Sequence, residues 1–241
     1  MMSQSEPAAL FPTEKAMMVV NVTQGTPEWR QARVGSLGAS RVHDAIARTR
    51  NGWAASRASV LSDIVCERLT GAPVEVYVTE AMRRGSALES DARAAYAFLR
   101  DVDVELVGLV RHPRITGTHA SPDGLIASCG LVEIKCPATN AHLATLLTGT
   151  MLDRYVTQCL WQLACTGRTW CDLVSYDNRL PEPLRLHVIR IERDEHRIGQ
   201  LEAMVQEFLA DVDATIERLR LVAGGAEVIR AHTMRQLEAA L

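Results

Sequence analysis

The spacing of apolar residues predicts where helices and strands alternate along this chain. Apolar positions recur at three- and four-residue steps over residues 80–100 and 198–219, which predicts two amphipathic helices. Between them lie short β-branched runs separated by Pro and Gly, as in the strands of a meander. These runs cover residues 102–110, 114–120, 124–127 and 131–135.

Shorter patterns add further elements. Thr26 suits a helix N-cap and Pro27 the first helical position, so we expect a helix to begin there. Gly71 and Pro73 are expected to end another helix. The remaining helices are predicted at residues 40–48, 58–70 and 151–166, and the remaining strands at 170–176 and 184–191.

This mixture of elements predicts one α/β domain, with helices on both sides of a mixed β-sheet. Residues 1–22 lack a clear pattern and are expected to form a loosely structured N-terminal segment. Residues 23–241 then form a single domain, since no repeat or low-complexity linker divides them.

Composition narrows the class of protein. With 47% apolar and 23% charged residues, the 241-residue chain is typical of a globular protein, and no apolar run reaches the roughly 18 residues of a membrane span. The N-terminus does not resemble a signal peptide. The six cysteines show no C-x-x-C spacing, which argues against a zinc or iron–sulfur site and favours the reducing cytoplasm. Because the net charge is −3, a polyanion such as DNA could bind only at a local basic surface.

Lysine is rare in this chain. Only two of the 26 basic residues are lysines, Lys15 and Lys135, and the others are arginines. Lys135 lies in "SPDGLIASCGLVEIKCP" (residues 121–137), where Asp123 and Glu133 also interrupt an apolar stretch. Buried charges are costly unless they are paired or bound to a metal, so this stretch is a candidate site.

The predicted strand geometry brings these charges together. In a strand over residues 131–135, Glu133 and Lys135 share one face with Leu131. A hairpin would place Asp123 beside Glu133. Two carboxylates, waters and a substrate phosphate suit Mg²⁺, and a lysine can orient a water or stabilise charge on a phosphate. This set predicts phosphodiester hydrolysis.

A structural interpretation of the same pattern is an ordinary hairpin, with an aspartate in its turn and an ion-paired glutamate. Pro122 before Asp123 and the apolar neighbours of Glu133 favour a site.

The Pro-Asp…Glu-x-Lys arrangement resembles the PD-(D/E)XK nuclease motif. Five further stretches resemble the phage lambda exonuclease and YqaJ-type viral recombinase nucleases, in the family's order over roughly residues 25–166. They are "EWRQARVGSLGAS", "GSALESDAR", "ASPDGL", "LVEIKCP" and "YVTQCLWQL". The later "VIRIERDE" is similar too.

This resemblance implies a restriction-endonuclease-like core with a central mixed sheet flanked by helices. It implies an alkaline exonuclease, dependent on Mg²⁺ with Mn²⁺ as a substitute, that digests one strand of linear double-stranded DNA from 5′ to 3′. The 3′ overhangs would serve recombination by strand annealing. The resemblance also implies a homotrimeric ring, a single-strand annealing protein as partner, and a phage or prophage protein in the host cytoplasm.

The family's catalytic roles map onto five residues. Asp123, Glu133 and the backbone carbonyl of Ile134 resemble its metal ligands, and Lys135 resembles the residue that handles the attacking water. Glu89 resembles an additional acidic residue near the metals. Without the resemblance, Glu89 would be a solvated helix carboxylate.

A second group resembles the family's pocket for the 5′-terminal phosphate. It consists of Arg33, Ser40, Ser121 and Gln158. An arginine fork with hydroxyl and amide donors suits a phosphate. The alternatives are a helix cap for Ser40, a surface role for Gln158 and an ion pair between Arg33 and Glu28.

A third group resembles DNA contacts. Met82 corresponds to an apolar wedge that splits the terminal base pairs, although it could equally be a core methionine. Arg83 and Arg84 would suit phosphate contacts, and Arg84 departs from the family's aromatic residue. Tyr155, Gln158 and Gln162 share one helix face, so this face can line a site.

Two other functions remain compatible with the sequence. One is a site- or structure-specific endonuclease on the same core. The other is a catalytically inactive DNA-binding scaffold for recombination, against which the intact Asp–Glu–Lys set argues. An ATP-driven motor is excluded because neither lysine lies in a P-loop motif.

Overall fold

Strand β8 (Gly130–Lys135) lies at the centre of the fold, with an apolar cluster on each face. Leu131 joins the larger cluster, which includes residues of α6 (Asp153–Thr166). Val132 and Ile134 join the smaller one, which includes residues of α4 (Glu80–Arg100). The alternation predicted for this strand is confirmed.

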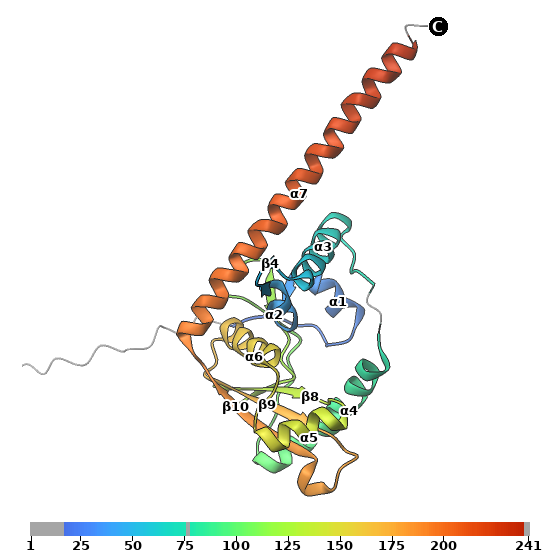
Figure 1. The fold of residues 1–241 in the computed structure, drawn as a ribbon. Helices are drawn as coiled ribbons and strands as arrows, with labels where there is room; N and C mark the ends of the chain where they lie inside the picture. Colours follow the sequence, from blue (N-terminus) through green and yellow to red (C-terminus); the bar gives the residue numbers. More distant parts are fainter. Residues whose placement is uncertain (1–16, 76–77, 239–241) are drawn as a thin grey trace, which may run out of the picture.

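The computed structural model describes residues 17–75 and 78–238 (Figure 1). Strand β8 pairs in parallel with β9 and antiparallel with β7, so its sheet is mixed, in the order β10-β9-β8-β7. A second four-stranded sheet has the order β1-β5-β6-β2, and β3 and β4 form a hairpin. The strands other than β8 are β1 (Met18–Val20), β2 (Leu37–Gly38), β3 (Arg48–Thr49), β4 (Gly52–Trp53), β5 (Leu109–Arg111), β6 (Thr118–Ala120), β7 (Gly124–Ile126), β9 (Trp170–Tyr176) and β10 (Leu186–Glu192).

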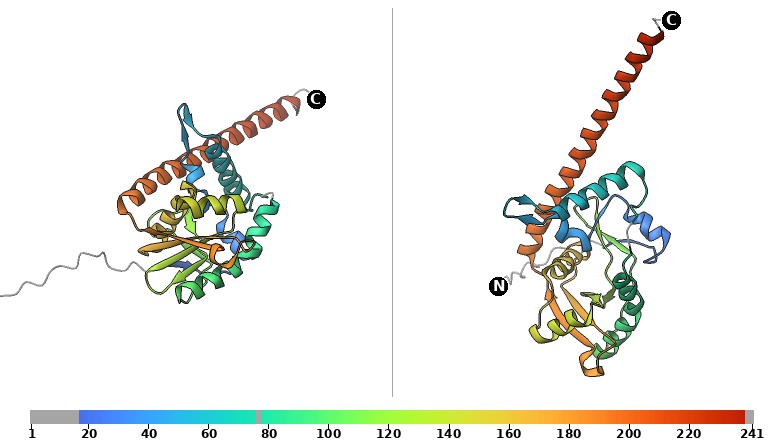
Figure 2. Two further views of the ribbon diagram at one scale, coloured as in Figure 1. Left: turned by 60° about the horizontal axis from the view of Figure 1, so that its bottom comes forward. Right: turned by 45° about the vertical axis from the view of Figure 1, so that its right-hand side comes forward.

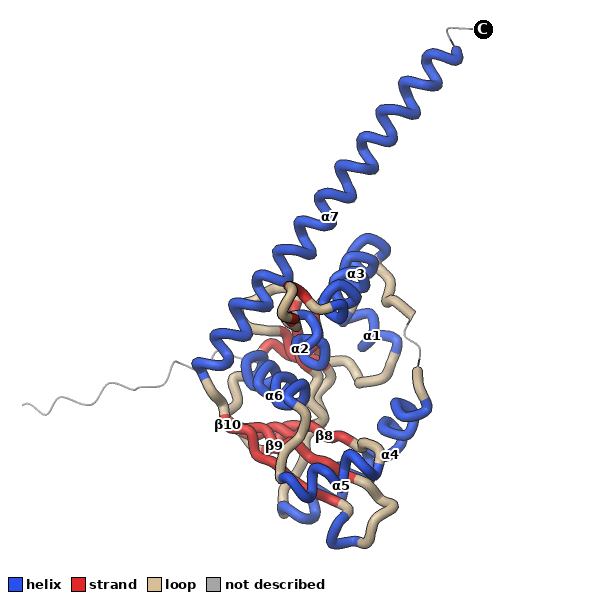
Figure 3. The backbone as a smooth tube through the Cα atoms, viewed as in Figure 1, coloured by secondary structure: helices blue, strands red, loops and turns tan. Residues whose placement is uncertain are grey.

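Helices surround these sheets, as the tube view and the two rotated views show (Figures 2 and 3). Helix α6 packs between the two sheets, and α4 covers the opposite face of β8. The remaining helices are α1 (Pro27–Arg33), η1 (Ala39–Arg41), α2 (Val42–Ala45), α3 (Ala55–Thr70), α5 (Thr139–Thr148), η2 (Glu182–Leu184) and α7 (Glu195–Glu238). None of the helices in the described ranges is long and apolar enough to cross a membrane.

Helix α7 begins against the body and then extends away from it (Figure 1). Its buried stripe includes Val205, Phe208 and Val212, which belong to the larger cluster. Farther along, Leu221 and Val222 are exposed. The amphipathic pattern over residues 198–219 therefore predicted the packed part of α7, and the helix continues beyond the predicted end.

The structure confirms the predicted fold class and most of the predicted elements. Thr26 caps α1 by accepting a hydrogen bond from the Trp29 N–H, and Gly71 ends α3 with a φ of 69°. The expectation of a loosely structured segment over residues 1–22 was wrong for Met18–Val20, which pair antiparallel with β5. Residues 1–16 of that segment lie outside the described residues.

Three other predictions need correction. Residues 102–108 hold only one bridge, Glu105 to Leu125, instead of a strand. The helix predicted at 40–48 is two short turns, η1 and α2, because the chain then enters the hairpin. Helix α5 was not predicted, since its exposed Leu147 obscures any amphipathic pattern.

A buried charge joins the neighbouring strands β9 and β10 to α4. Asp172 on β9 is fully buried, accepts hydrogen bonds from both Nε and Nη2 of Arg190, and accepts another from the Tyr96 hydroxyl at 2.8 Å. The Tyr96 ring itself packs in the smaller cluster.

We predict that Asp172→Ala lowers the free energy of unfolding by about 2–3 kcal/mol, because it removes the charge-assisted hydrogen bonds from the half-exposed Arg190 and leaves the buried Tyr96 hydroxyl without its acceptor. Tyr96→Phe removes a single hydrogen bond and should cost about 1 kcal/mol. Urea unfolding monitored by circular dichroism measures both. Equal losses in the two variants would contradict this ranking.

Candidate active site

Asp123 and Glu133 face each other across the β7–β8 hairpin. Gly124 pairs with Val132, so Asp123, just before β7, lies opposite Glu133. One Asp123 carboxylate oxygen accepts a hydrogen bond of 2.6 Å from the Ile134 N–H. In a strand, the N–H and carbonyl of one residue point to the same neighbour. The Ile134 carbonyl therefore faces the same side as Asp123.

The Glu133 carboxylate is held by three donors. It is 2% exposed and accepts hydrogen bonds from Lys135 Nζ and Gln158 Nε2, each at 2.6 Å, and from Gln162 Nε2 at 2.5 Å. Lys135 also donates to Gln158 Oε1 at 3.1 Å. Both glutamines lie on α6, so helix and strand position the carboxylate together.

Charge is unevenly distributed around this pair. Burial, with Glu133 and Glu89 nearby, raises the pKa of Asp123. Burial alone would lower the pKa of Lys135, but the nearby Glu133 and Asp123 outweigh it, so the net change is upward. The lysine is therefore a charged ammonium, and the Asp123 side of the site still lacks positive charge.

This donor set fits Mg²⁺. The candidate ligands are hard carboxylate and carbonyl oxygens, and the described residues contain no group of three or more His, Cys, Asp or Glu that would form a complete cage. Mg²⁺ is usually bound by one or two carboxylates and retains several waters. The raised pKa of Asp123 gives a further reason, since a cation would relieve the excess of negative charge.

Glu89 reaches the site through an arginine that the sequence did not single out. Arg93, one helical turn later on α4, pairs with Glu89 and donates from Nε to the Asp123 carbonyl at 3.0 Å. Glu89 is thus a partly exposed helix carboxylate that is paired with Arg93. Its helix is tied to the residue expected to bind metal.

Arg33 is largely buried without a carboxylate partner. Its guanidinium stacks over the Trp29 ring at 4.0 Å, and its Nε donates to His119 Nε2 at 3.2 Å. Burial lowers the pKa of Arg33, against the effect of the more distant Glu67. No ion pair links Arg33 to Glu28 or to any other acid in the described ranges. The alternative of a Glu28 pair was wrong.

Of the other predicted phosphate ligands, Ser121 lies beside the Trp29 ring and Gln158 beside the Glu133 carboxylate, whereas Ser40 contacts neither group. Ser121 accepts a hydrogen bond of 3.1 Å from Trp29 Nε1, on the ring that stacks on Arg33. Gln158 is buried against Glu133 and is not a surface residue. Ser40 is exposed in η1, which packs on α6, and it caps neither η1 nor α2.

The side chains predicted to contact DNA differ in exposure and in how many protein partners they already have. Met82 is 48% exposed and is not a core residue. Arg83 is exposed, with one long contact to a backbone carbonyl, and the Tyr155 ring lies 5.0 Å from Lys135 Nζ. Arg84 requires a correction. It pairs with buried Asp177 at 2.9 Å and donates to the carbonyls of Cys136 and Pro137, so it holds the chain after β8 and is not free to grip a phosphate.

A comparison with known families matches residues 28–169 to the YqaJ-like viral recombinase domain. The chain belongs to the YqaJ-like viral recombinase family. The expected resemblance is thereby confirmed, and the matched range contains all the candidate site residues. A comparison with curated proteins gave no match.

Solved structures agree with this family. An alkaline exonuclease from Laribacter hongkongensis is 46% identical, with a TM-score of 0.77, over 83% of this chain and 98% of that one. The same exonuclease in complex with dAMP gives a TM-score of 0.78 at the same identity and coverage. A phage-related exonuclease from Haemophilus somnus is 12% identical over 79% of this chain and 99% of that one, and its TM-score of 0.61 shows the shared fold. The core is restriction-endonuclease-like, as expected.

Sequence reasoning missed several residues of this site in the YqaJ-like domain. Trp29 and His119 hold Arg33, and Arg93 holds Asp123 and Glu89. Gln162, which the predicted helix face already included, holds Glu133. His119 is far from Arg33 in the sequence and gave no local signal, whereas Trp29 lies four residues before Arg33 on α1, a spacing that could have indicated their contact.

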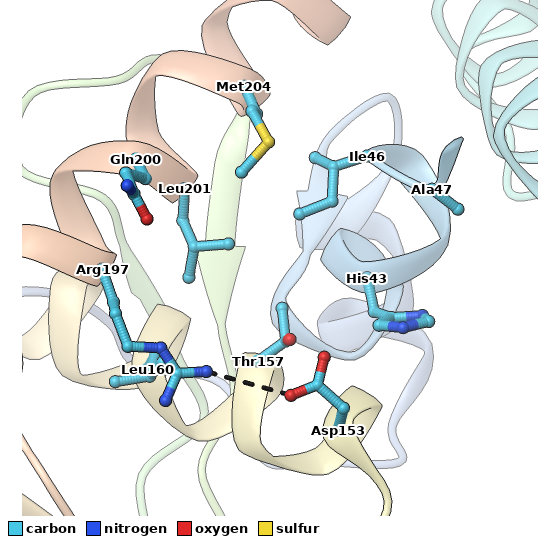
Figure 4. A pocket seen from close by; sticks show the side chains of 10 residues that line it. All are labelled: His43, Ile46, Ala47, Asp153, Thr157, Leu160, Arg197, Gln200, Leu201 and Met204. Carbon is cyan, nitrogen blue, oxygen red and sulfur yellow. Dashed lines mark ion pairs between the residues drawn. The ribbon is translucent and has the colours of Figure 1, made fainter. Parts of the chain in front are cut away.

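A separate pocket of about 290 Å³ lies between α2, α6 and α7 (Figure 4). Arg197 and Asp153 face each other across it at 3.9 Å, and Met204 lines its apolar side. None of the candidate site residues lines this pocket. The candidate site at the hairpin is therefore separate from this cavity.

Proposed function

We propose that this chain is a Mg²⁺-dependent 5′-to-3′ exonuclease that digests one strand of linear duplex DNA. Its products would be 3′ overhangs for recombination with a single-strand annealing protein. Family membership and the 46% identity to an alkaline exonuclease support a DNA exonuclease role. The observation that carries the finer proposal is the short link, through Ser121 and Trp29, between an acidic pair and an arginine that has no acidic partner among the described residues.

The acidic pair and the arginine are linked by a short segment. Ser121 contacts the Trp29 ring that stacks on Arg33, and Asp123 follows two residues later. Two residues of extended chain span at most about 7 Å. A terminal phosphate held by Arg33 would thus place the next phosphodiester near the carboxylates, which favours cleavage from a 5′ end.

Each catalytic residue then has a defined task. Asp123, Glu133 and the Ile134 carbonyl would hold Mg²⁺, which supplies Lewis-acid activation of the phosphate and of a water when bound. Lys135 would orient the attacking water and stabilise charge on the phosphate. Gln158 and Gln162 fix the Glu133 carboxylate, which keeps the ligands in place before substrate arrives.

We predict that Lys135→Ala retains DNA binding but loses about 10²-fold or more in cleavage, the scale of one preorganised charge-stabilising group. Single-turnover digestion of end-labelled linear duplex measures cleavage, and binding is measured in EDTA. Arg220→Ala, which removes an exposed arginine paired only with Glu217, is the matched control.

A Lys135 variant that cleaves at nearly the wild-type rate would remove the role given to this lysine. Asp123→Ala offers a contrast, because it should shift the Mg²⁺ titration as well as the rate. Covalently closed circular duplex should resist digestion by the wild type, which separates an exonuclease from an endonuclease.

We predict that Arg33→Ala slows digestion of 5′-phosphorylated ends and narrows their advantage over 5′-hydroxyl ends. A bidentate arginine–phosphate contact is charge-assisted and about twice as strong as a neutral hydrogen bond. Timed digestion of both substrates by both proteins gives the ratio. If the variant prefers phosphorylated ends as strongly as the wild type, Arg33 is not the phosphate anchor.

We also propose a homotrimeric ring. An acidic chain with a net charge of −3 binds DNA poorly as a monomer, because sequence-independent affinity comes from Lys and Arg at the phosphates. A ring can present its arginines inward around the duplex. We expect light scattering to give three times the 26.5 kDa chain mass. A stable monomer at micromolar concentration with undiminished processivity would refute the ring.

A further inference from the structure

His119 lies between Arg33 and Ser36 in the interior of the protein. It is 1% exposed on β6. Its Nε2 accepts the hydrogen bond from Arg33 Nε at 3.2 Å, and its Nδ1 lies 2.8 Å from Ser36 Oγ. Both ring nitrogens are thus in use, one toward the arginine and one toward the serine.

The partners determine the protonation of this ring. Arginine has only N–H donors, so His119 Nε2 must present a lone pair to Arg33. The proton of the neutral ring is then on Nδ1, which donates to the Ser36 hydroxyl. Burial, followed by the nearby charges of Arg33 and Arg111, lowers the pKa of His119 to about 3. The imidazole is uncharged at neutral pH.

An uncharged acceptor has a different effect from a carboxylate. A carboxylate beside Arg33 would neutralise it and compete with any phosphate. His119 fixes the guanidinium while leaving its full charge available. This agrees with the absence of an acidic partner for Arg33 among the described residues.

The remaining contacts restrict Arg33 further. Trp29 covers one face of the guanidinium at 4.0 Å. Gly38 approaches so closely that an added Cβ would lie 3.1 Å from His119 Nε2 and 3.5 Å from Arg33 Nη2. With Nε bound and one face stacked, the two terminal nitrogens remain for a ligand, and a tetrahedral anion accepts such a fork through two oxygens.

We propose that His119 is a positioning residue that sets the preference for 5′-phosphorylated ends by anchoring Arg33 without neutralising it. This inference rests on the proposed role of Arg33 as the phosphate anchor. In this proposal a buried histidine, which is not one of the expected phosphate ligands, controls which DNA ends are recognised.

The decisive measurement is the ratio of digestion rates on 5′-phosphorylated and 5′-hydroxyl linear duplex. His119→Leu removes the acceptor, and we expect the ratio to fall about tenfold, the scale of one hydrogen bond to a charged group. The rate on 5′-hydroxyl ends should change much less. His119→Gln places an amide oxygen near the position of Nε2 and should restore most of the ratio.

His142→Leu is the matched control. His142 is also a buried histidine, and its Nδ1 lies 2.7 Å from the Ser175 hydroxyl, but it does not contact Arg33. It should leave the ratio unchanged even if stability falls. Binding of both duplexes in EDTA provides a readout independent of Mg²⁺, in which His119→Leu should weaken only the phosphorylated duplex.

Ser36→Ala keeps the test conclusive if His119→Leu does not fold. Without the serine hydroxyl the ring can carry its proton on Nε2, which opposes the Arg33 N–H, so the ratio should fall in the same direction. An unchanged ratio in the folded His119→Leu, or in Ser36→Ala when His119→Leu is unfolded, overturns the proposal.

The double variant Arg33→Ala/His119→Leu separates this inference from the proposed function. If His119 acts through Arg33, His119→Leu has no further effect on the ratio once Arg33 is alanine. An equal fall in the wild-type and Arg33→Ala backgrounds would falsify an action through Arg33. A ratio that depends on Arg33 but not on His119 removes this inference alone. If Arg33→Ala keeps the full preference, the phosphate anchor itself is lost, and this inference with it.

Discussion

The buried Glu133 carboxylate is the constraint on which the rest of the site depends. A charge that is 2% exposed must be fully hydrogen-bonded or it destabilises the fold. Lys135 and Gln158 satisfy one of its oxygens, and Gln162 satisfies the other. This requirement binds α6 to β8 at a fixed separation. The same contacts that make the buried carboxylate tolerable therefore fix its position for the proposed metal site.

Two arginines of α4 hold this helix against the site. Besides their carboxylate partners, both donate hydrogen bonds to backbone carbonyls. Arg93 donates to the Asp123 carbonyl at one end of the hairpin, and Arg84 donates to the Cys136 and Pro137 carbonyls just after β8. Helix α4, which carries Glu89, is therefore held both at Asp123, before β7, and at Cys136 and Pro137, after β8. Backbone contacts of this kind position a site more rigidly than surface ion pairs do.

The acidic centre was predictable from sequence, and its supports were not. Asp123, Glu133 and Lys135 were conspicuous because each charge interrupts an apolar stretch, and strand alternation assigns them to a face. Arg93 looks like ordinary helix surface in a chain so rich in arginine, and Arg84 was predicted to contact phosphates instead of backbone carbonyls. His119 meets Arg33 across 86 residues of sequence, so no local pattern announces it. The prediction of short elements failed for a related reason, since β1 forms a strand only by pairing with the distant β5.

The structure has two opposite charge imbalances, joined by the segment from Ser121 to Asp123. Around Asp123 there is too little positive charge, and burial with its acidic neighbours raises its pKa. At Arg33 a cation is anchored by a neutral histidine and a tryptophan ring, and no acid of the described residues forms an ion pair with it. A protein optimised only for stability would pair such groups with each other. Keeping them apart costs folding energy, and a divalent cation on one side with a terminal phosphate on the other would correct both imbalances at once.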